Sequence, residues 1–146
     1  MKKLFLLLFL GFTLVAFSQT TLIPDPNFEQ RLIDLGYDTA PINGSVPTAN
    51  ISNVTSLTLV NNITDLTGIE DFAALTYLDC SGNPLISLDL SSNTALQELQ
   101  CSACQLTNLN VSNNTALTLL NAQINQLTSL DVSNNNALQI FYCQNN

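Results

Sequence analysis

The sequence has no histidine, and only three of its 146 residues are lysine or arginine. Lys2 and Lys3 stand at the N-terminus, so from residue 19 onward Arg31 is the only cation beside eleven acidic residues. The usual general base and cationic electrophiles are therefore missing, and any catalysis would have to use carboxylates or thiols. An acidic surface repels phosphate backbones and anionic lipid heads, which argues against a nucleic-acid partner and against binding to a membrane surface.

The first 18 residues are typical of a secretory signal peptide. Lys2 and Lys3 form a positive n-region, residues 4–15 are an almost unbroken apolar run, and small residues precede a predicted cleavage after Ser18. The apolar run is too short to span a bilayer well, so a retained anchor is the weaker interpretation. We expect an exported chain, secreted or at the cell surface, with no membrane insertion after signal cleavage.

A 21-residue repeat organises the rest of the chain. Residues 75–95, 96–116 and 117–137 align without insertion, residues 138–146 begin a further unit, and residues 54–74 form an earlier unit with a slipped middle. Residues that recur at a fixed period stack on their copies in a solenoid, so each apolar column becomes a ladder in one continuous core. The apolar columns are Leu75, Leu96, Leu117 and Leu138; Leu78, Leu99, Leu120 and Phe141; Leu85, Leu106 and Leu127; Leu88, Leu109 and Leu130; and Leu90, Val111 and Val132.

The alternation within each unit predicts one short parallel strand per coil. Asn62, Asn83, Asn125 and Asn146 recur just after this strand, where a buried amide can bond the backbone of a tight corner. Asn93, Asn114 and Asn135 mark a second corner. The predicted fold is a solenoid of the α/β class that is rich in β-structure.

Together the columns read L-x-x-L-x-C/L-x-x-N-x-L, which is the signature of leucine-rich repeats. The 21-residue form, with cysteine in the second strand column and "LDVSNN" at residues 130–135, most resembles the cysteine-ladder repeats of internalin J and similar secreted bacterial proteins. Residues 20–53 resemble the capping segment of exported leucine-rich repeat proteins of the Bacteroidetes type. The resemblance implies a curved solenoid with a role in adhesion or protein binding, and it specifies no ligand.

Residues 19–53 are predicted to be an N-terminal cap with one short helix, because the first coil would otherwise expose its apolar edge. Asp25 or Asn27 is suited to cap this helix, Pro26 to start it and Gly36 to end it. Its apolar face is formed by Phe28, Leu32 and Leu35.

The repeats span residues 54–146, about four and a half coils, and no C-terminal cap follows them. The sequence ends at Asn146, directly after a predicted strand, which leaves Phe141 and Cys143 uncovered. Because terminal repeats normally carry a polar cap, we expect a truncated array from a longer protein. Docking of the open edge on a partner is the alternative.

Cys101 and Cys104 form a C-x-x-C pair, a spacing found in metal sites and redox-active dithiols. Cys101 shares its column with Cys80 and Cys143, and Ala122 and Leu59 fill the same position, which indicates inward packing. Cys104 belongs to the column of Asn83 and Asn125.

A zinc site needs four ligands, and Cys143 lies two coils, about 10 Å, from Cys101. The Cα spacing of neighbouring coils falls within the disulfide range, but side chains in register hold their Cβ atoms slightly too far apart. We therefore predict structural ladders with free thiols, no metal and no cofactor.

The outward-facing strand positions vary from coil to coil, whereas the core columns hardly change, so packing does not dictate their identity. In this architecture they are expected to line the concave surface. The candidate binding residues are Tyr77, Asp79, Glu98, Gln100, Leu119, Asn121, Ile140 and Tyr142. This mixed aromatic and acidic strip is the kind of surface that a protein or surface glycan could use, and an ordinary solvated face fits equally well.

Asp79 and Glu98 are also the best case for an enzyme, since neighbouring strands could bring them together as a glycosidase pair. No enclosing cleft is evident from the sequence, so a carbohydrate-active enzyme is the distant alternative. Asp89, Asn110 and Asp131 form a column better suited to capping turns than to calcium. We predict a non-catalytic binding or adhesion module, with a structural spacer for a missing C-terminal domain as the runner-up.

Overall fold

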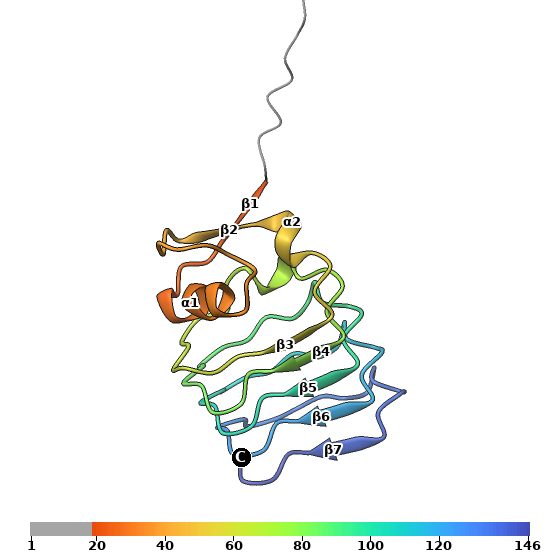
Figure 1. The fold of residues 1–146 in the computed structure, drawn as a ribbon. Helices are drawn as coiled ribbons and strands as arrows, with labels where there is room; N and C mark the ends of the chain where they lie inside the picture. Colours follow the sequence, from red (N-terminus) through yellow and green to blue (C-terminus); the bar gives the residue numbers. More distant parts are fainter. Residues whose placement is uncertain (1–18) are drawn as a thin grey trace, which may run out of the picture.

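The computed structural model describes residues 19–146, so the predicted signal peptide lies outside the described residues. A five-stranded parallel sheet runs through the molecule in the order β3 (Ser56–Thr58), β4 (Tyr77–Asp79), β5 (Glu98–Gln100), β6 (Leu119–Asn121) and β7 (Ile140–Tyr142) (Figure 1). Each residue pairs with the residue 21 positions later, as in Tyr77 with Glu98 and Glu98 with Leu119. The sequence period is therefore the strand register, which confirms the predicted solenoid with one short parallel strand per coil.

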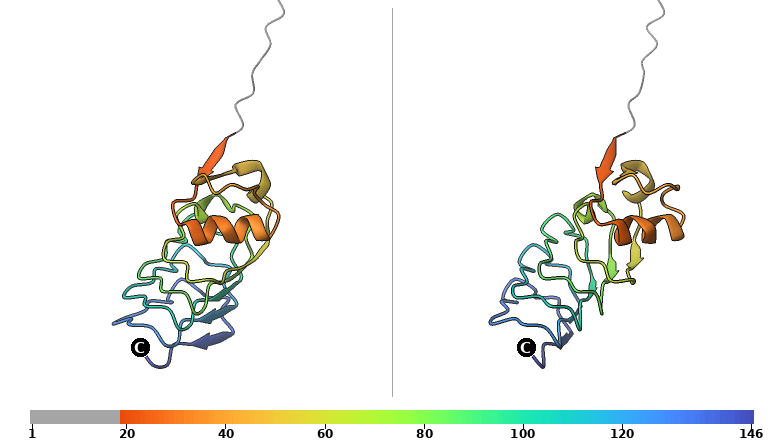
Figure 2. Two further views of the ribbon diagram at one scale, coloured as in Figure 1. Left: turned by 60° about the vertical axis from the view of Figure 1, so that its left-hand side comes forward. Right: turned by 90° about the vertical axis from the view of Figure 1, so that its left-hand side faces the viewer.

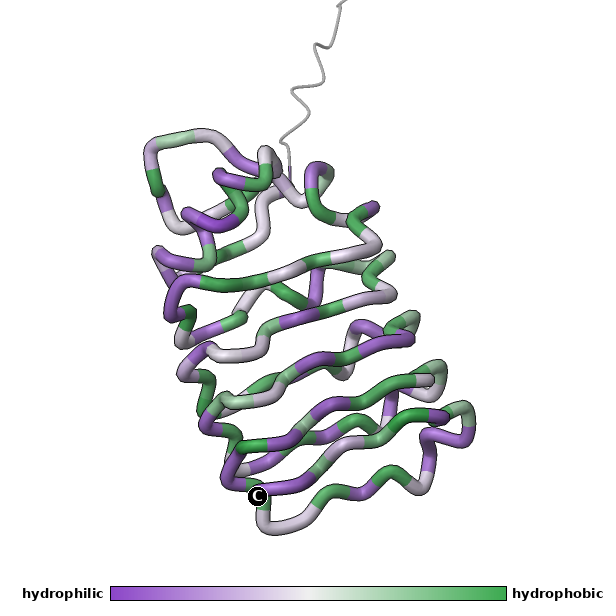
Figure 3. Tube along the Cα trace, turned by 60° about the horizontal axis from the view of Figure 1, so that its bottom comes forward, coloured by the Kyte–Doolittle hydropathy of each residue, from purple (hydrophilic) through white to green (hydrophobic). Residues whose placement is uncertain are grey.

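The strands form because their central residue is apolar and points inward. Leu57, Leu78, Leu99 and Leu120 are at most 1% exposed, whereas the residues on either side of each are partly or fully exposed. This alternation gives one buried and one outward face, as expected for period-two patterning. Figure 3 shows hydrophobic and hydrophilic residues alternating along the stacked coils.

The inner columns are best buried in the middle of the stack. Leu90 and Val111 are fully buried, and Val132 is only partly buried. Likewise Leu78, Leu99 and Leu120 are fully buried, whereas Phe141 in β7 is 39% exposed. Each ladder thus gains burial from a coil on both sides, which is the nearest-neighbour stabilisation of repeat proteins.

Asn83, Asn125 and Asn146 satisfy the backbone at the first corner, whereas Asn62 of the same column is exposed. Asn83 Nδ2 donates to the carbonyl oxygens of Leu59 (3.0 Å) and Cys80 (2.9 Å), and its Oδ1 accepts from the Ile63 amide (2.9 Å). Asn125 makes the equivalent bonds two coils further along the chain. Each amide therefore joins two adjacent coils through three backbone groups that a sharp turn would leave bare.

The residue just before this asparagine column has a positive φ in every coil. The residues are Asn61, Gly82, Ala103, Ile124 and Asn145, with φ between 51° and 87°. The left-handed region suits glycine and asparagine but costs energy for alanine and more for a β-branched residue. The need for a positive φ at this position was not evident from the sequence, because Ala103 and Ile124 are not residues typical of the left-handed region.

The second corner has a different amide ladder, in which Nδ2 donates to two carbonyl oxygens and the buried Oδ1 atoms of Asn93, Asn114 and Asn135 have no hydrogen-bond partner within residues 19–146. Asn114 Nδ2 donates to the carbonyl oxygens of Leu90 (3.0 Å) and Asn93 (2.9 Å), and Asn135 does the same to Val111 and Asn114. Asn93, Asn114 and Asn135 are at most 4% exposed. Both asparagine columns therefore hold the coils together from within.

Residues 19–53 cover the first coil with more structure than the single predicted helix. β1 (Thr20–Leu22) pairs antiparallel with β2 (Ser45–Pro47), and α1 (Pro26–Asp34) and α2 (Thr48–Ile51) complete this segment. The short 3-10 helix η1 (Ile69–Asp71) belongs to the first coil. Figure 2 shows α1 lying across the end of the stacked coils.

The helix α1 is tied to the first coil by its capping residue and its apolar face. Asp25 is the N-cap, and its Oδ1 accepts from the amides of Asn27 (2.8 Å) and Phe28 (3.1 Å). Its Oδ2 accepts from the Thr64 amide and hydroxyl (2.7 and 2.8 Å). Phe28 is fully buried and stacks on Phe72, with ring centroids 6.3 Å apart.

Candidate functional site

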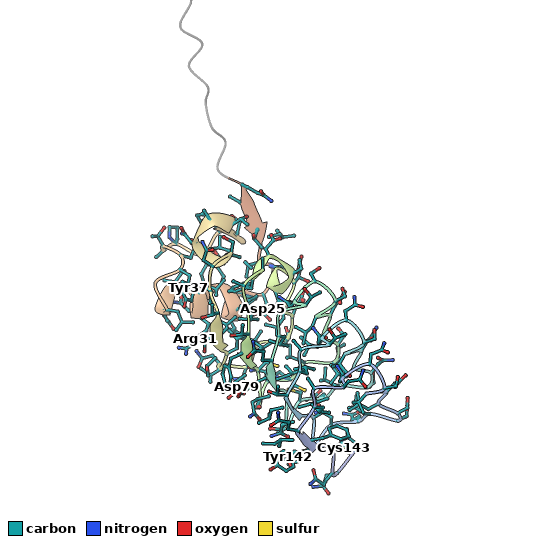
Figure 4. The ribbon with its side chains drawn as sticks, turned by 90° about the vertical axis from the view of Figure 1, so that its right-hand side faces the viewer. Asp25, Arg31, Tyr37, Asp79, Tyr142 and Cys143 are labelled. Carbon is teal, nitrogen blue, oxygen red and sulfur yellow. The ribbon has the colours of Figure 1, made fainter. Side chains whose placement is uncertain are left out.

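The eight predicted binding residues all lie on the outward face of β4 to β7, which we call the strand face. Tyr77 and Asp79 come from β4, Glu98 and Gln100 from β5, Leu119 and Asn121 from β6, and Ile140 and Tyr142 from β7. Asp79 and Tyr142 lie on the same side of the molecule (Figure 4). The structure thus gathers residues spread over 66 positions of the sequence into one surface.

The register orders this surface into two parallel rows. Tyr77, Glu98, Leu119 and Ile140 are aligned in one row, and Asp79, Gln100, Asn121 and Tyr142 in the other. In the second row Asn121 Nδ2 donates to Gln100 Oε1 (3.0 Å), and Asp79 Oδ1 accepts from the Ser81 amide (3.0 Å). These bonds position the polar side chains before any partner arrives.

Asp79 and Glu98 are diagonal neighbours and not directly opposite each other, because Asp79 pairs with Gln100 and Glu98 with Tyr77. Neither carboxylate lines either of the two cavities described below. A glycosidase pair needs a substrate held between the two groups. The diagonal placement of Asp79 and Glu98, outside these two cavities, therefore does not reproduce that arrangement.

The strand face is polar at β4 and β5 and becomes apolar toward β7. Ile140 and Tyr142 are 43% and 44% exposed, and Leu119 is partly exposed beside them. At the other end, burial and the nearby Asp79 and Glu98 carboxylates raise the pKa of the Tyr77 phenol. Tyr77 is therefore a neutral hydroxyl under a negative potential at neutral pH.

Arg31 was assigned no role from the sequence, yet it reaches the same end of the sheet. Its Nε donates to the carbonyl oxygen of Thr58 in β3 (3.1 Å). The sequence did contain one indication of this contact, because Arg31 lies one helical turn after Asn27 on the same face of α1. Asn27 Nδ2 donates to the Asn62 carbonyl (3.1 Å), so this face is turned toward the first coil. α1 thus places the only cation of residues 19–146 against β3, where the bonded residue Thr58 pairs directly with Asp79 of β4.

The cysteines occupy the positions predicted for two ladders. Cys80 and Cys101 are fully buried in one column with Ala122, and Cys143 in the last coil is exposed. Cys104 replaces asparagine in the corner column, where its Sγ lies 3.4 Å from the Cys80 carbonyl oxygen. All four are free thiols.

The thiols of Cys80 and Cys101 are poor nucleophiles. A hydrogen bond with Cys104 and burial raise the pKa of Cys80 well above its ordinary value, and burial raises the pKa of Cys101 strongly. Both are therefore protonated at neutral pH, and the thiolate is the reactive form. Within residues 19–146, no group of three or more Cys, Asp or Glu side chains is placed to hold a metal ion.

The larger of two cavities, about 390 Å³, lies among the connecting loops and includes none of the strand-face residues. Its carboxylates are used by their own turns, since Asp65 accepts from the Thr67 amide and Asp89 from the Ser91 amide, both within 2.9 Å. Asp89 and Asp131 therefore cap turns, since Asp131 likewise accepts from the Ser133 amide. Hydrogen bonds from the backbone and hydroxyl of Ser91 lower the pKa of Asp89. The smaller cavity, about 240 Å³, lies beside β7 and includes Phe141 and Cys143.

Three solved structures share this architecture. The functional domain of InlJ from Listeria monocytogenes, which includes a cysteine ladder, is 39% identical over 85% of this chain and has a TM-score of 0.76. The internalin InlF from the same species is 22% identical over 77% of the chain with a TM-score of 0.68. Internalin C2 is 18% identical over 85% of the chain with a TM-score of 0.53.

The chain is a leucine-rich repeat solenoid with the fold of the internalins. It spans 28% of the length of the InlJ domain and 33% of that of InlF. No family model and no curated protein matches the sequence. Among the described residues, no helix is long and apolar enough to cross a membrane.

Proposed function

We propose that this chain is a non-catalytic binding module that acts outside the cell or at its surface and binds a protein through the strand face. The proposal rests on a contrast between the inward positions and the strand-face positions, both of which repeat every 21 residues. Inward positions keep leucine, cysteine or asparagine in successive coils, whereas the strand face presents a different side chain in each.

The composition of the strand face supports a protein partner. Aromatic and aliphatic side chains beside polar groups are enriched at the centres of protein interfaces. Tyr142 and Ile140 are more than 40% exposed on a rigid strand, so little conformational entropy opposes their use. The similarity to internalins and the signal-peptide pattern of residues 1–18 are in keeping with a role at or outside the cell surface.

Replacing Tyr77, Glu98 and Tyr142 together by alanine tests this function. The purified chain is applied to one array of extracellular protein domains and to a second array of glycans. A matched triple variant with Ile42, Ile86 and Asp34 replaced by alanine also removes two apolar groups and one acid, all exposed and none on the strand face.

We expect protein binding that the strand-face variant loses and the matched variant keeps, with thermal unfolding unchanged in both. Equal binding by the two triple variants would refute the proposal and favour a structural spacer. Binding confined to the glycan array would refute the protein class of ligand. Hydrolysis of a glycan that Asp79→Asn abolishes would show an enzyme instead.

A further inference from the structure

The two carboxylates of the strand face outnumber the one cation that lies near them. Asp79 and Glu98 flank the Tyr77 ring, one two residues along the same strand and the other directly opposite on β5. From residue 19 onward Arg31 is the only basic side chain, and its Nε is bonded to the Thr58 carbonyl on β3. Asp79 and Glu98 thus bring two negative charges beside an aromatic ring, against the single positive charge of Arg31.

The apolar end of the same surface lies at a defined separation from this pair. Leu119 and Ile140 continue the row of Tyr77 and Glu98, and β6 and β7 are two strands away from β4 and β5 respectively. Neighbouring strands are about 4.8 Å apart, so the centres of the two halves are separated by about 10 Å. A partner that uses both halves needs two different groups at that spacing.

We propose that the partner is a protein segment that presents an arginine or lysine to Tyr77, Asp79 and Glu98 and an apolar side chain, about 10 Å away, to Leu119, Ile140 and Tyr142. This inference rests on the proposed function and specifies the chemistry of its partner.

Charge complementarity and the aromatic ring both favour a cation at the polar half. A guanidinium or ammonium group over Tyr77 gains a cation–π contact and faces two carboxylates, and the arginine fork suits carboxylate oxygens. A protein ligand with acidic side chains at this place would leave like charges opposed. The apolar half supplies the desolvated contact that charge alone does not.

In an α-helix, residues seven positions apart lie on one face and are about 10.5 Å apart along the axis, which matches the separation of the two halves. The test therefore uses fluorescein-labelled helical peptides of an alanine-based host with arginine and leucine seven positions apart. In one control peptide glutamate replaces the arginine, and in another serine replaces the leucine. Binding to the purified chain is followed by fluorescence anisotropy.

Two protein variants separate the strand face from net charge. Asp79→Asn with Glu98→Gln removes two charges from the strand face, and Asp34→Asn with Asp131→Asn removes two exposed charges elsewhere. We expect the arginine–leucine peptide to bind about tenfold more weakly to the first variant and equally well to the second. Each control peptide should bind more weakly than the parent, and binding should weaken in about 1 M salt, where the Debye length is about 3 Å.

The inference is overturned if the glutamate peptide binds as well as the arginine peptide, if no peptide binds, or if both variants lose affinity equally. The function proposed above is judged separately. A protein partner could fail to bind the alanine triple variant and still bind the Asp79→Asn, Glu98→Gln variant. That result would support binding through the strand face and refute the preference for a cationic partner.

Discussion

Cys104 is the weak position in the first corner ladder, and replacing it by asparagine should stabilise the protein. Asn83 and Asn125 each donate two bonds, at 2.8–3.1 Å, to carbonyl oxygens on adjacent coils and accept one backbone amide. Cys104 donates weakly to the carbonyl oxygens of Cys80 (3.4 Å) and Ser102 (3.7 Å), and its sulfur has weak hydrogen bonds with the Cys80 thiol and the Asn83 and Gly82 amides. A thiol is a weak donor, so this coil lacks most of the bonding that an amide supplies there.

The size of the effect follows from the count of bonds. An asparagine at residue 104 replaces the weak thiol bonds by two amide donations and offers an acceptor to the Leu85 amide, which now bonds the Asn83 carbonyl (2.8 Å). At about 0.5–1.5 kcal/mol net for each bond, and after the loss of side-chain freedom, we expect a gain of about 1 kcal/mol in the free energy of unfolding. For a chain of this size that raises the melting temperature by about 4 °C.

Circular dichroism during heating measures this change, and Asn125→Cys is its mirror control. The reverse substitution should lower the melting temperature, because it leaves the Leu106 amide without its acceptor and removes the donation to the Cys101 carbonyl. A Cys104→Asn variant that melts below the parent, together with an Asn125→Cys variant that melts with it, would refute the ladder argument.

Three further substitutions test other parts of the fold. Cys101→Asp should prevent folding, because a charge in a fully buried column costs several kcal/mol against a total stability of about 5–15 kcal/mol; secretion yield and circular dichroism measure it. Ile124→Gly should raise the free energy of unfolding by about 0.5–1 kcal/mol in urea titration, because Ile124 has a φ of 55°. Asp25→Asn should lower the melting temperature at neutral pH, and this difference should shrink below about pH 3.8.

The sign of the pH effect follows from the contacts of Asp25. Burial opposes its ionisation, but hydrogen bonds from Thr64, Phe28 and Asn27 outweigh burial and hold its pKa below the usual 3.8. A lowered folded-state pKa stabilises the fold above the unfolded value, and this stabilisation is lost as the pH falls through the folded value. A difference between parent and Asp25→Asn that grows in acid would contradict this assignment.

Two matched variants control for size and flexibility. Cys101→Ala should fold, because Ala122 fills the same column one coil on, and its failure to fold would show that volume, not charge, decides the effect. Ile86→Gly should reduce stability, because Ile86 is also an exposed isoleucine but does not have a positive φ. Equal stabilisation by both glycine variants would refute the left-handed strain at Ile124.

The fold was predictable because many residues recur with the same 21-residue period. Leu78, Leu99 and Leu120 recur every 21 positions, and a register error would expose all of them, so the sequence determines the strand pairing. The left-handed column was missed because only Gly82 and two coils of asparagine show it directly. The pairing of β1 with β2 was missed because a three-residue strand carries too little alternation to identify.

The outward position of the strand-face residues was predictable from the sequence, but their role was not. Alternation places Tyr77 and Glu98 outward, and the structure brings them into register. The proposed partner depends on side chains that no packing constraint fixes. Arg31 lies beside this surface because of the orientation of α1, which the repeat does not encode. The sequence therefore predicts which residues form the strand face. The chemistry of that face depends on the three-dimensional arrangement of its charges.

Hydroxyl-radical footprinting of the chain, alone and with a protein captured on the array, tests the central claim most directly. Tyr77, Leu119 and Tyr142 are exposed or partly exposed, so radicals should modify them in the free chain. Binding through the strand face predicts strong protection of these three residues and unchanged modification of Ile86, which is 64% exposed and lies off this face. Protection of Ile86 with unchanged modification of Tyr77 and Tyr142 would contradict the account.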